Sequence, residues 1–367
     1  MNYVIKFKER RKYGVFANII KDNMAHIQFY YPKRLAFSPA DFEYPGLGGT
    51  ESSIVLLSKA LAARGHRVEV FCACWKPGVY DGVTWRGAWE IENTPLPDIM
   101  IHVRTKSSVI ERKAKTNIFW MLDDRADGAI FFSEQYPKSQ VVLASDTMKG
   151  RLQAAGFSGN ITKIHLPIET ERFENGVLPS TSKICLHTSM PNRGLVELLK
   201  FWPQIKEKVP DAQLIATSGW ELWGYTKEEA ADRLRQTIGT DIVKDSVIFT
   251  GVLPRQEFID LVKKARIGVF PSFFPEMYCL AAAEIAVSGR PIIVSKLDAL
   301  SERVDNNVTG YSITGDIRSK EVQQQFVEKI VYLLNNDKLV DEMGAAAIKQ
   351  RADVACNIVA SNWEKIF

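Results

Sequence analysis

Two carboxylates with a fixed spacing could bind the two ends of one elongated ligand. Glu276 and Glu284 lie eight residues apart in a stretch of good helix formers, and Gly289 and Pro291 follow where a helix would end. Short apolar runs on both sides are typical of buried strands, so the stretch predicts a strand–turn–helix–strand unit of a parallel sheet. If the helix begins near Glu276, the two acids are about 12 Å apart along its axis.

The start of this helix would also offer a binding site for an anion. Its first residues would be Met277, Tyr278, Cys279 and Leu280. The free backbone N–H groups of a first turn and the positive end of the helix dipole attract phosphates. A nucleotide sugar has hydroxyl groups at both ends and phosphates between them, so Glu276 would face the sugar and Glu284 the ribose. Alternatively, Glu276 only caps the helix and Glu284 is solvated or ion-paired, although an acid among apolar neighbours rarely lacks a partner.

The same stretch resembles a known family signature. The pattern P-S-x(3)-E-x(7)-E, followed by A-x-S-G-x-P-I-I-V-S, is similar to the donor site of retaining glycosyltransferases of the GT-B fold, family four, also called glycosyl transferases group 1. The resemblance covers about residues 26–367 and implies two Rossmann-like α/β domains that face a cleft. In that family the first Glu contacts the donor sugar and the second holds the ribose. Met277 stands where members often have a small residue, which alters the expected shape of the sugar pocket.

Two further loops resemble parts of the family's donor site. Gly48 and Gly49 begin a G-G-x-E sequence after the first predicted strand, and in the family this loop approaches the donor phosphates and the acceptor. A glycine pair alone is common in tight turns, but the absence of G-x-G-x-x-G argues against a nicotinamide dinucleotide site. The resemblance also implies that the loop with Val252 and Leu253 lies against the nucleotide base through its backbone.

A basic residue in the second half could bind the diphosphate. Family members usually have an Arg after the first strand of this half and a Lys before the next glycine, and both bind the pyrophosphate. Arg193 occupies the Lys position, whereas the Arg position falls near Thr188, so that hydroxyl groups of Thr188 or Ser189 would replace one cation. Arg can bind phosphate through two parallel hydrogen bonds. The alternative is that Arg193 is an exposed loop residue.

The acceptor side carries acids but lacks a histidine that is common in the family. Where members often have a His-Asp pair, this chain has Leu122-Asp123-Asp124. The resemblance therefore implies an acceptor-side role for Asp123 or Asp124. The role of the histidine would be absent or supplied by His102, for which a structural role within its strand is the alternative.

The hydrophobic pattern divides the chain into two α/β halves. Strands are predicted at 26–31, 67–74, 99–103, 118–122, 141–144, 183–187, 213–217, 247–250, 267–270 and 292–294. Helices are predicted at 50–64 with Thr50 as N-cap, at 148–155, from 195, and at 256–264, 320–334 and 352–367. Segment 166–182 contains Pro, Ser and Thr and is predicted to connect the halves. The expected domains are 1–168 on the acceptor side, 169–350 for the donor, and a helix at 351–367 that crosses back onto the first domain.

Composition excludes several other classes of protein. Of 367 residues, 46% are hydrophobic and 25% charged, as in globular domains, and the net charge of +4 is too small for a nucleic-acid-binding surface. Five scattered cysteines indicate reduced thiols and a cytoplasmic protein. No apolar run reaches the roughly 20 residues of a membrane span, and no signal peptide is recognisable. The basic segment 1–24 is predicted to be an exposed arm, with an added strand or a peripheral membrane contact as alternatives.

Together these observations predict a transferase that moves a hexosyl or related sugar from a UDP-, GDP- or ADP-sugar to a hydroxyl of a glycan, lipid or small molecule, with retention. The residues expected at the reaction centre are Glu276, Arg193, Asp123 and Asp124. The sequence has no D-x-D triplet, so we expect no metal and no tightly bound cofactor. We expect a monomer or homodimer. An epimerase on the same fold and a non-catalytic nucleotide-sugar-binding protein are the alternatives.

Overall fold

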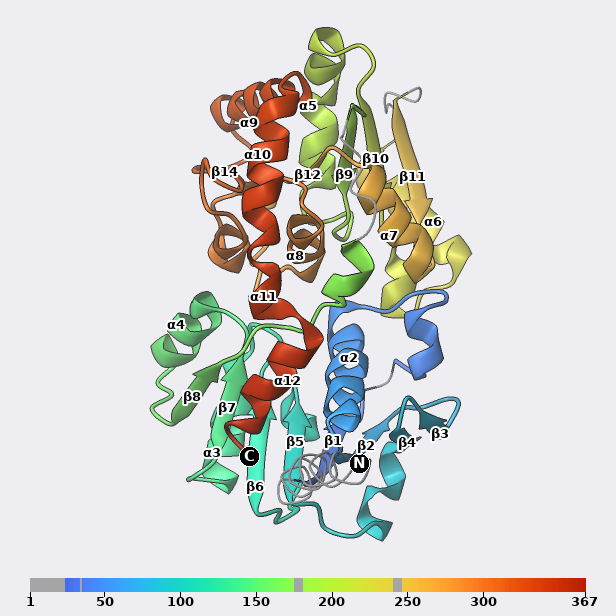
Figure 1. The fold of residues 1–367 in the computed structure, drawn as a ribbon, viewed down its shortest axis with the longest axis vertical. Coiled ribbons are helices and arrows are strands. Elements are labelled where there is room, and N and C mark those ends of the chain that lie inside the picture. The colour runs from blue at the N-terminus through green and yellow to red at the C-terminus, as the bar shows by residue number, and fades with distance from the viewer. Residues whose placement is uncertain (1–23, 34, 175–180, 240–245) are drawn as a thin grey trace, which may run out of the picture.

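The chain forms two α/β lobes, each built on one central sheet. The computed structural model describes residues 24–33, 35–174, 181–239 and 246–367. The two lobes lie one above the other in Figure 1, with the first half of the chain in the lower lobe. The basic residues predicted to form an arm lie in segment 1–23, outside the described residues, as do residues 175–180 of the predicted connector.

The first lobe contains an eight-stranded sheet within the described residues. Its strands are β1 (His26–Tyr31), β2 (Arg67–Cys72), β3 (Gly78–Tyr80), β4 (Val83–Gly87), β5 (Ile99–Val103), β6 (Thr116–Trp120), β7 (Gln140–Leu143) and β8 (Asn160–Lys163). Their order is β3-β4-β2-β1-β5-β6-β7-β8, and neighbours run parallel except for β3 and β4. The helices of this lobe and its connector are α2 (Gly49–Ala63), α3 (Ala126–Gln135), α4 (Asp146–Ala154), η1 (Pro39–Phe42), η2 (Ala88–Asn93), η3 (Lys106–Ser108) and η4 (Thr170–Phe173).

The second lobe contains a six-stranded parallel sheet within the described residues. Its strands are β9 (Ile184–His187), β10 (Gln213–Thr217), β11 (Val247–Gly251), β12 (Ile267–Phe270), β13 (Ile292–Ser295) and β14 (Gly310–Ile313), in the order β11-β10-β9-β12-β13-β14. The helices are α5 (Leu195–Lys208), α6 (Lys227–Ile238), α7 (Arg255–Lys264), α8 (Leu280–Val287), α9 (Lys320–Leu334), α10 (Asp337–Ile348), η5 (Trp220–Trp223) and η6 (Asp298–Arg303).

The order of strands predicts where a ligand binds. In the first sheet the chain order reverses between β1 and β5, and in the second between β9 and β12. Ligands of open parallel sheets bind at the carboxyl ends of the strands beside such a reversal. Residues that directly follow these four strands are therefore the first candidates for the site.

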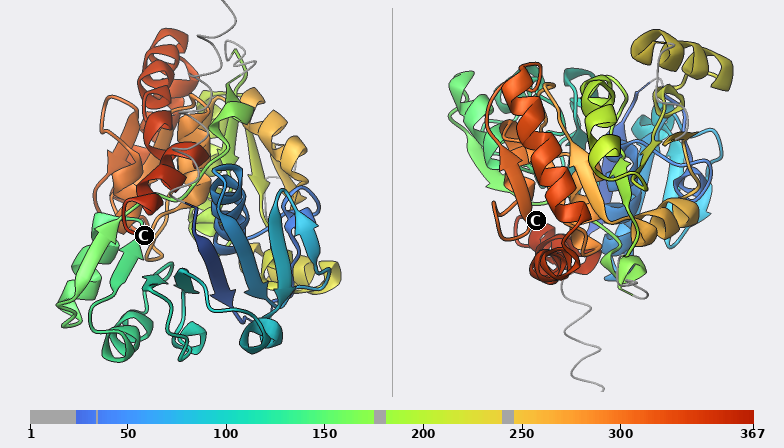
Figure 2. Two further views of the ribbon diagram at one scale, coloured as in Figure 1. Left: turned by 60° about the horizontal axis from the view of Figure 1, so that its bottom comes forward. Right: turned by 90° about the horizontal axis from the view of Figure 1, so that it is seen from above.

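The end of the chain returns to the first lobe. Helix α11 (Arg351–Val354) lies at the junction of the lobes, and α12 (Cys356–Glu364) packs on α2 in the lower lobe (Figures 1 and 2). The amide of Ile168 donates a 2.8 Å hydrogen bond to the carbonyl of Val354, so the two crossings between the lobes are joined. The predicted pair of Rossmann-like domains with a helix crossing back is confirmed, while the bounds of the domains stay a prediction.

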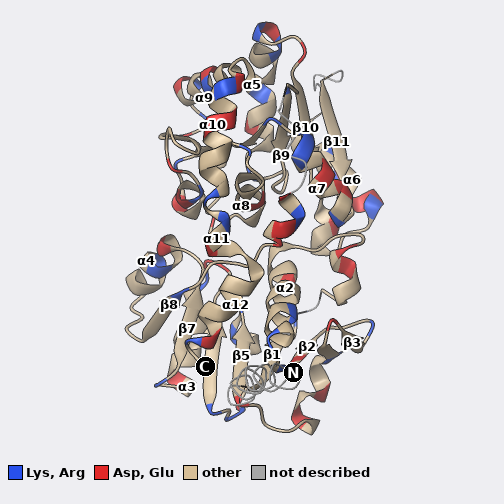
Figure 3. Cartoon of the chain, viewed as in Figure 1, with Lys and Arg blue, Asp and Glu red and all other residues tan. Residues whose placement is uncertain are grey.

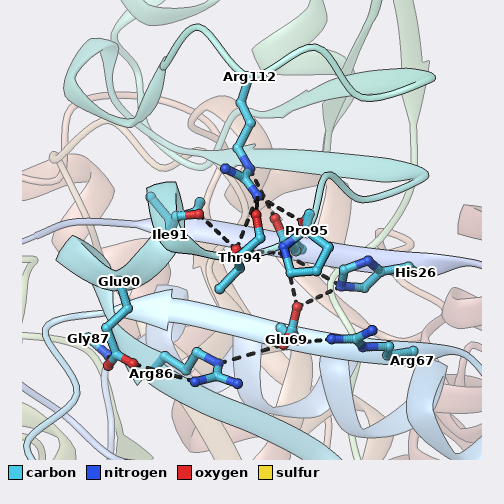
Figure 4. Close-up of polar contacts among 11 residues, drawn as sticks. His26, Arg67, Glu69, Arg86, Gly87, Glu90, Ile91, Thr94, Pro95 and Arg112 are labelled. Carbon is cyan, nitrogen blue, oxygen red and sulfur yellow. Dashed lines mark hydrogen bonds and ion pairs between the residues drawn. The ribbon is translucent and has the colours of Figure 1, made fainter.

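One face of the first sheet carries a buried polar network. Glu69, which is 2% exposed, accepts a hydrogen bond of 2.9 Å from Gln28. Its carboxylate also lies 2.6 Å from Nε2 of His26 (Figure 4). Arg112 donates to Gln28 and to the carbonyl groups of Thr94 and Pro95 at 3.2, 2.8 and 2.9 Å. These hydrogen bonds hold Thr94 and Pro95, which follow η2, against strands β1 and β2. The buried side chains of Gln28 and Arg112 find their hydrogen-bond partners within this network.

Several predicted boundaries are wrong. Gly48 rather than Thr50 is the N-cap of α2, and no side chain caps this helix. The predicted helix 352–367 is interrupted at Ala355, whose ψ of 137° is extended. The helix expected from Glu276 begins only at Leu280. Strands β3, β4, β8 and β14 and helices α3, α6 and α10 were not predicted, and the four strands are too short to show a clear apolar period.

The surface carries both signs of charge on both lobes. Figure 3 shows Lys and Arg interspersed with Asp and Glu over the whole ribbon. Among the described residues, no helix combines the length and apolarity required to cross a membrane. All five cysteines lie in described segments and are free thiols.

Candidate active site

Two adjoining cavities lie between the lobes. The smaller, of about 160 Å³, is lined by Thr188, Val252, Leu253, Arg255 and Glu284, among others. The larger, of about 710 Å³, is lined by Asp123, Asp124, Arg193, Glu276 and Met277, among others. Both are lined by Gly48, Gly49, Leu222 and Leu280. The combined space is elongated, falls within the size of ordinary ligand pockets, and holds one of the two paired acids in each part.

Glu276 reaches the larger cavity from a loop and not from a helix. After β12, the hydroxyl of Ser272 accepts a hydrogen bond from the amide of Phe274, which turns the chain. Cys279 is left-handed, with φ of 59°, and only then does α8 begin at Leu280. The predicted 12 Å separation along one helix is therefore wrong, because the positive φ of Cys279 breaks the helix before it reaches Glu276. Leu280, the first residue of α8, still lines both cavities.

Arg193 and Glu276 form an ion pair at the centre of the site. Nη1 of Arg193 lies 3.2 Å from both carboxylate oxygens of Glu276, and the guanidinium lies 4.6 Å from the ring centroid of Phe274. Burial raises the pKa of the Glu276 carboxyl, and the charge of Arg193 opposes this rise. Nε of Arg193 is buried and makes no hydrogen bond within the described residues. Arg193 is thus not an exposed loop residue, and it retains donor capacity for a ligand.

A glycine allows Arg193 to approach this position. Gly194 has φ of 104°, and a Cβ at this residue would lie 2.3 Å from the carbonyl oxygen of Pro271. Any side chain would push the loop after β9 away from the loop after β12. The close contact of these two loops places Arg193 against Glu276.

Glu284 also has a basic partner. Its Oε1 lies 2.6 Å from Nη1 of Arg255, the first residue of α7, and both residues are 8% exposed. The pair lines the smaller cavity beside Thr188, whose hydroxyl is buried without a hydrogen-bond partner among the described residues. Ser189, in contrast, lines neither cavity. The expectation that an acid in this apolar helix has a partner is confirmed.

The first lobe contributes a second cluster of charges to the larger cavity. Arg104 donates to Asp123 at 3.0 Å and to Thr50 at 3.2 Å, and Glu51 accepts a 2.7 Å hydrogen bond from Tyr31. Burial raises the pKa of Asp123, an effect that Arg104 opposes. Arg104 has φ of 78°, a conformation that is costly for a residue with a side chain and that concentrates at functional sites.

Sequence reasoning missed the two cations of this cluster. Lys33 and Arg104 line the larger cavity, and each follows a strand at the reversal point of the first sheet, β1 and β5 respectively. Burial and the charge of Arg104 lower the pKa of Lys33. The position of both residues just after a predicted strand was a signal that could have identified them. Arg255 had no such signal, since its contacts with the connector depend on tertiary structure.

His102 does not reach the site. It is fully buried, its Nδ1 lies 2.9 Å from the carbonyl oxygen of Ser108, and its ring packs against Phe132 and Tyr136. Burial lowers the pKa of His102 to about 4. The hypothesis that it replaces the missing histidine at the reaction centre is wrong, because its side chain points to the side of the sheet that α3 covers.

Several contacts hold the lobes together around the cavities. Ser145, at the start of α4, donates a 2.7 Å hydrogen bond to the carbonyl oxygen of Met277. Glu302 accepts hydrogen bonds from the amides of Asp146 and Thr147, and Arg151 donates to Asp298. The loop that carries Glu276 is therefore positioned by both lobes. Within the described segments, no group of three or more His, Cys, Asp or Glu side chains could hold a metal ion.

Comparisons with solved structures define the class of fold. Sucrose-phosphate synthase from Thermosynechococcus elongatus superposes with a TM-score of 0.71 over 92% of this chain and 97% of that chain, at 15% identity. Anabaena Alr3699/HepE in complex with UDP-glucose gives a TM-score of 0.71 over 93% and 98% of the two chains, at 14% identity. The chain therefore has the GT-B fold of glycosyltransferases, as predicted.

Sequence comparisons show which family the second lobe resembles. Residues 169–350 match the family Glycosyl transferases group 1. The uncharacterized glycosyltransferase YqgM of Bacillus subtilis is 32% identical over 161 residues, which is 42% of either chain. Trehalose synthase of Pyrococcus horikoshii is 24% identical over 43% of this chain and 36% of its own length. The chain thus matches less than half the length of these curated relatives.

Proposed function

We propose that this protein transfers a sugar from a nucleotide-diphosphate sugar to an acceptor hydroxyl, with retention at the anomeric carbon. The base and ribose would occupy the smaller cavity, and the sugar and acceptor the larger one. The observation that carries this proposal is the pair of joined cavities with Glu284 in one and Glu276 in the other. The family match of the second lobe supports a sugar donor, and a fold relative was solved with UDP-glucose.

Each polar group has a role in this proposal. Glu284 accepts hydrogen bonds from the ribose, and the backbone beside Val252 and Leu253 faces the base. Arg193 binds the diphosphate through the N–H groups that Glu276 leaves free, and Glu276 accepts hydrogen bonds from the sugar. The amide ends at Leu280 and the backbone of the Gly48-Gly49 turn add donors for the phosphates.

The reaction requires charge stabilisation rather than a protein nucleophile. The bond between the anomeric carbon and the diphosphate oxygen breaks, and the acceptor oxygen forms the new bond on the same face. The departing phosphate oxygen takes the proton of the acceptor hydroxyl. Arg193 stabilises the negative charge that develops on the leaving group, while Glu276 faces the positively charged sugar. Asp123 and Asp124 would orient the acceptor from the first lobe.

The sequence supports the remaining parts of the proposal. Because the chain has no D-x-D triplet, we propose a reaction without a metal and without a tightly bound cofactor. The donor is a UDP-, GDP- or ADP-sugar, and the acceptor is a glycan, a lipid or a small molecule. We propose a cytoplasmic monomer or homodimer, with peripheral membrane contact if the acceptor is a lipid.

A panel of donors tests the proposal. Thermal unfolding is measured with UDP-, GDP- and ADP-sugars, since a ligand at 100 times its Kd adds about 2.7 kcal/mol of stability. The best donor is then incubated with and without added glycan and lipid acceptors, and released nucleotide is measured. Sugar epimerised without an acceptor would indicate the epimerase instead. Tight donor binding with no turnover would favour a non-catalytic binding protein. This alternative is supported by Leu122, which stands beside Asp123 where the family often has a histidine.

A further inference from the structure

A row of alternating charges connects the first lobe to the proposed ribose site. Glu43 of the first lobe contacts Arg172 of the connector at 2.6 Å, and Arg172 contacts Glu169 at 3.1 Å. Glu169 lies 3.7 Å from Nε of Arg255, and Nη1 of Arg255 lies 2.6 Å from Glu284. Each charge thus has opposite charges as neighbours along the row, which runs across the junction of the lobes.

Arg255 is held rigidly at the centre of this row. Its guanidinium lies 5.1, 5.7 and 5.6 Å from the ring centroids of Phe42, Phe173 and Phe258, which come from the first lobe, the connector and α7. Its amide donates a 2.9 Å hydrogen bond to the carbonyl oxygen of Glu43. Its Nη2 is buried and makes no hydrogen bond with any described residue. Arg255 also lines the smaller cavity, beside Glu284.

We propose that Arg255 is a positioning residue that fixes Glu284 for the ribose and, through Glu169 and Arg172, makes nucleotide binding depend on the contact between the lobes. This inference rests on the proposed function. The planar guanidinium presents several N–H groups at fixed angles, so one side chain can hold Glu284 and Glu169 together. If the lobes separate, Arg255 loses Phe42 and Glu43, and Glu284 loses its fixed orientation. A bound nucleotide therefore favours the closed arrangement, and closure favours the nucleotide in turn.

A double-mutant cycle tests the first part. UDP, GDP and ADP are titrated by calorimetry against the full chain, Arg255→Met, Glu284→Ala and the double variant. Arg255→Met should weaken the best nucleotide about tenfold or more, and in the Glu284→Ala background it should have no further effect. Arg255→Lys should recover only part of the loss, since Lys lacks the planar fork. Thermal unfolding without ligand identifies variants that lose affinity only because they are unfolded.

A remote variant tests the connection to the first lobe. Arg172→Met breaks the row between Glu43 and Glu169 without touching either cavity, and it should weaken nucleotide binding several-fold only when Arg255 is present. Arg235→Met is the matched control, because it removes an exposed ion pair with Asp232 within α6, away from the row and from the contacts between the lobes, and affinity should stay within about twofold.

The outcomes separate this inference from the proposed function. If the unaltered chain binds none of the three nucleotides, the proposed function and this inference both fail. If it binds one of them and folded Arg255→Met binds equally well, only the inference fails. Additive losses in the cycle would overturn the positioning role. Unchanged affinity in Arg172→Met would overturn the dependence on the lobe contact.

Discussion

Arg193 contacts both carboxylate oxygens of Glu276 through a single nitrogen, Nη1, at 3.2 Å. This arrangement links the residue proposed for the diphosphate to the residue proposed for the sugar. Because Arg193 lines the larger cavity and contacts Glu276 through Nη1 alone, the proposed phosphate contact does not require that Glu276 be displaced. Both charges can therefore act on the donor at the bond that breaks between sugar and diphosphate.

Replacing Arg193 should impair both binding and turnover. Arg193→Ala removes the cation that faces the leaving diphosphate and leaves the buried Glu276 unpaired, so kcat/KM for the donor should fall at least 100-fold. Arg193→Lys should recover part of this loss, since the family usually has Lys there. Steady-state kinetics with the best donor checks both variants. Normal turnover in Arg193→Ala would rule out the diphosphate role.

Glu276→Gln should impair the reaction with the intact donor but leave the affinity for the free nucleotide nearly unchanged. The amide keeps the size of the side chain but removes the charge, so the sugar hydroxyls lose a charge-assisted acceptor. Because such contacts strengthen as the sugar gains positive charge, kcat as well as KM should deteriorate. The free nucleotide diphosphate should bind nearly as before, which calorimetry can measure. Equal losses for both ligands would mean that the donor lies in the opposite orientation.

Glu284→Ala should weaken the intact donor and the free nucleotide alike, because both contain the ribose. A hydrogen bond to a charged group contributes roughly 1.5 to 3 kcal/mol, which corresponds to about a 10- to 150-fold change in Kd. Calorimetry with the donor and with its nucleoside diphosphate gives the two values side by side. A folded variant that binds the nucleotide with unchanged affinity would exclude a ribose contact.

The polar network around Glu69 should make stability depend on acid pH. Burial raises the pKa of this carboxyl, but hydrogen bonds from Gln28 and His26 outweigh burial, and the pKa lies below its ordinary value of 4.5. Its contribution to stability is complete above the unfolded-state value and is lost as the pH falls through the lower folded-state value. At pH 7, Glu69→Gln should cost about 1 to 3 kcal/mol, and the difference from the unaltered chain should shrink as the pH falls below the ordinary value of 4.5.

Urea unfolding at a series of pH values measures this difference. Glu228→Gln is the matched control, because Glu228 is exposed on α6, and its effect should stay within about 0.5 kcal/mol. The free energies of unfolding of Glu69→Gln and the unaltered chain could also differ by the same amount at every pH. This result would show that the substitution removes packing and not a charge.

Trp363→Ala should destabilise the first lobe. Trp363 is completely buried, and its ring centroid lies 5.2 Å from that of Trp120 at the end of β6. Loss of a buried Trp side chain typically costs about 3 to 5 kcal/mol. Ile358→Ala is the control, since Ile358 on the same helix is 40% exposed and should change stability little. Equal effects of the two substitutions on urea unfolding would contradict the docking of α12.

Much of the fold could be predicted because its central strands are continuous apolar runs. The ranges of β1, β5, β10 and β12 follow from their residues alone, as does α9 from its apolar period. The start of α8 could not be predicted, since propensity does not reveal that Cys279 adopts a left-handed conformation. There the tertiary contact between Met277 and Ser145 overrides the local preference for helix.

Sequence reasoning found the residues of the candidate site that belong to a recognisable signature. It missed the residues that reach the site only through tertiary packing. Glu276, Glu284 and Arg193 line the cavities as expected, and the sequence places each of them just after a strand or within its following helix. Arg255 and Glu169 meet only because the connector crosses beside α7. No sequence pattern encodes this contact, and it determines how Glu284 is held.

The return of α12 to the first lobe has a consequence for the order in which the protein is made. Strand β6 leaves the ribosome long before residues 356–367, yet Trp120 within it needs Trp363 to complete its packing. The second lobe has all its strands and one of its apolar clusters available earlier, so this part can pack while the first lobe is still open. The half that is synthesised first is thus completed last, and until then its unfinished face is exposed to chaperones and proteases.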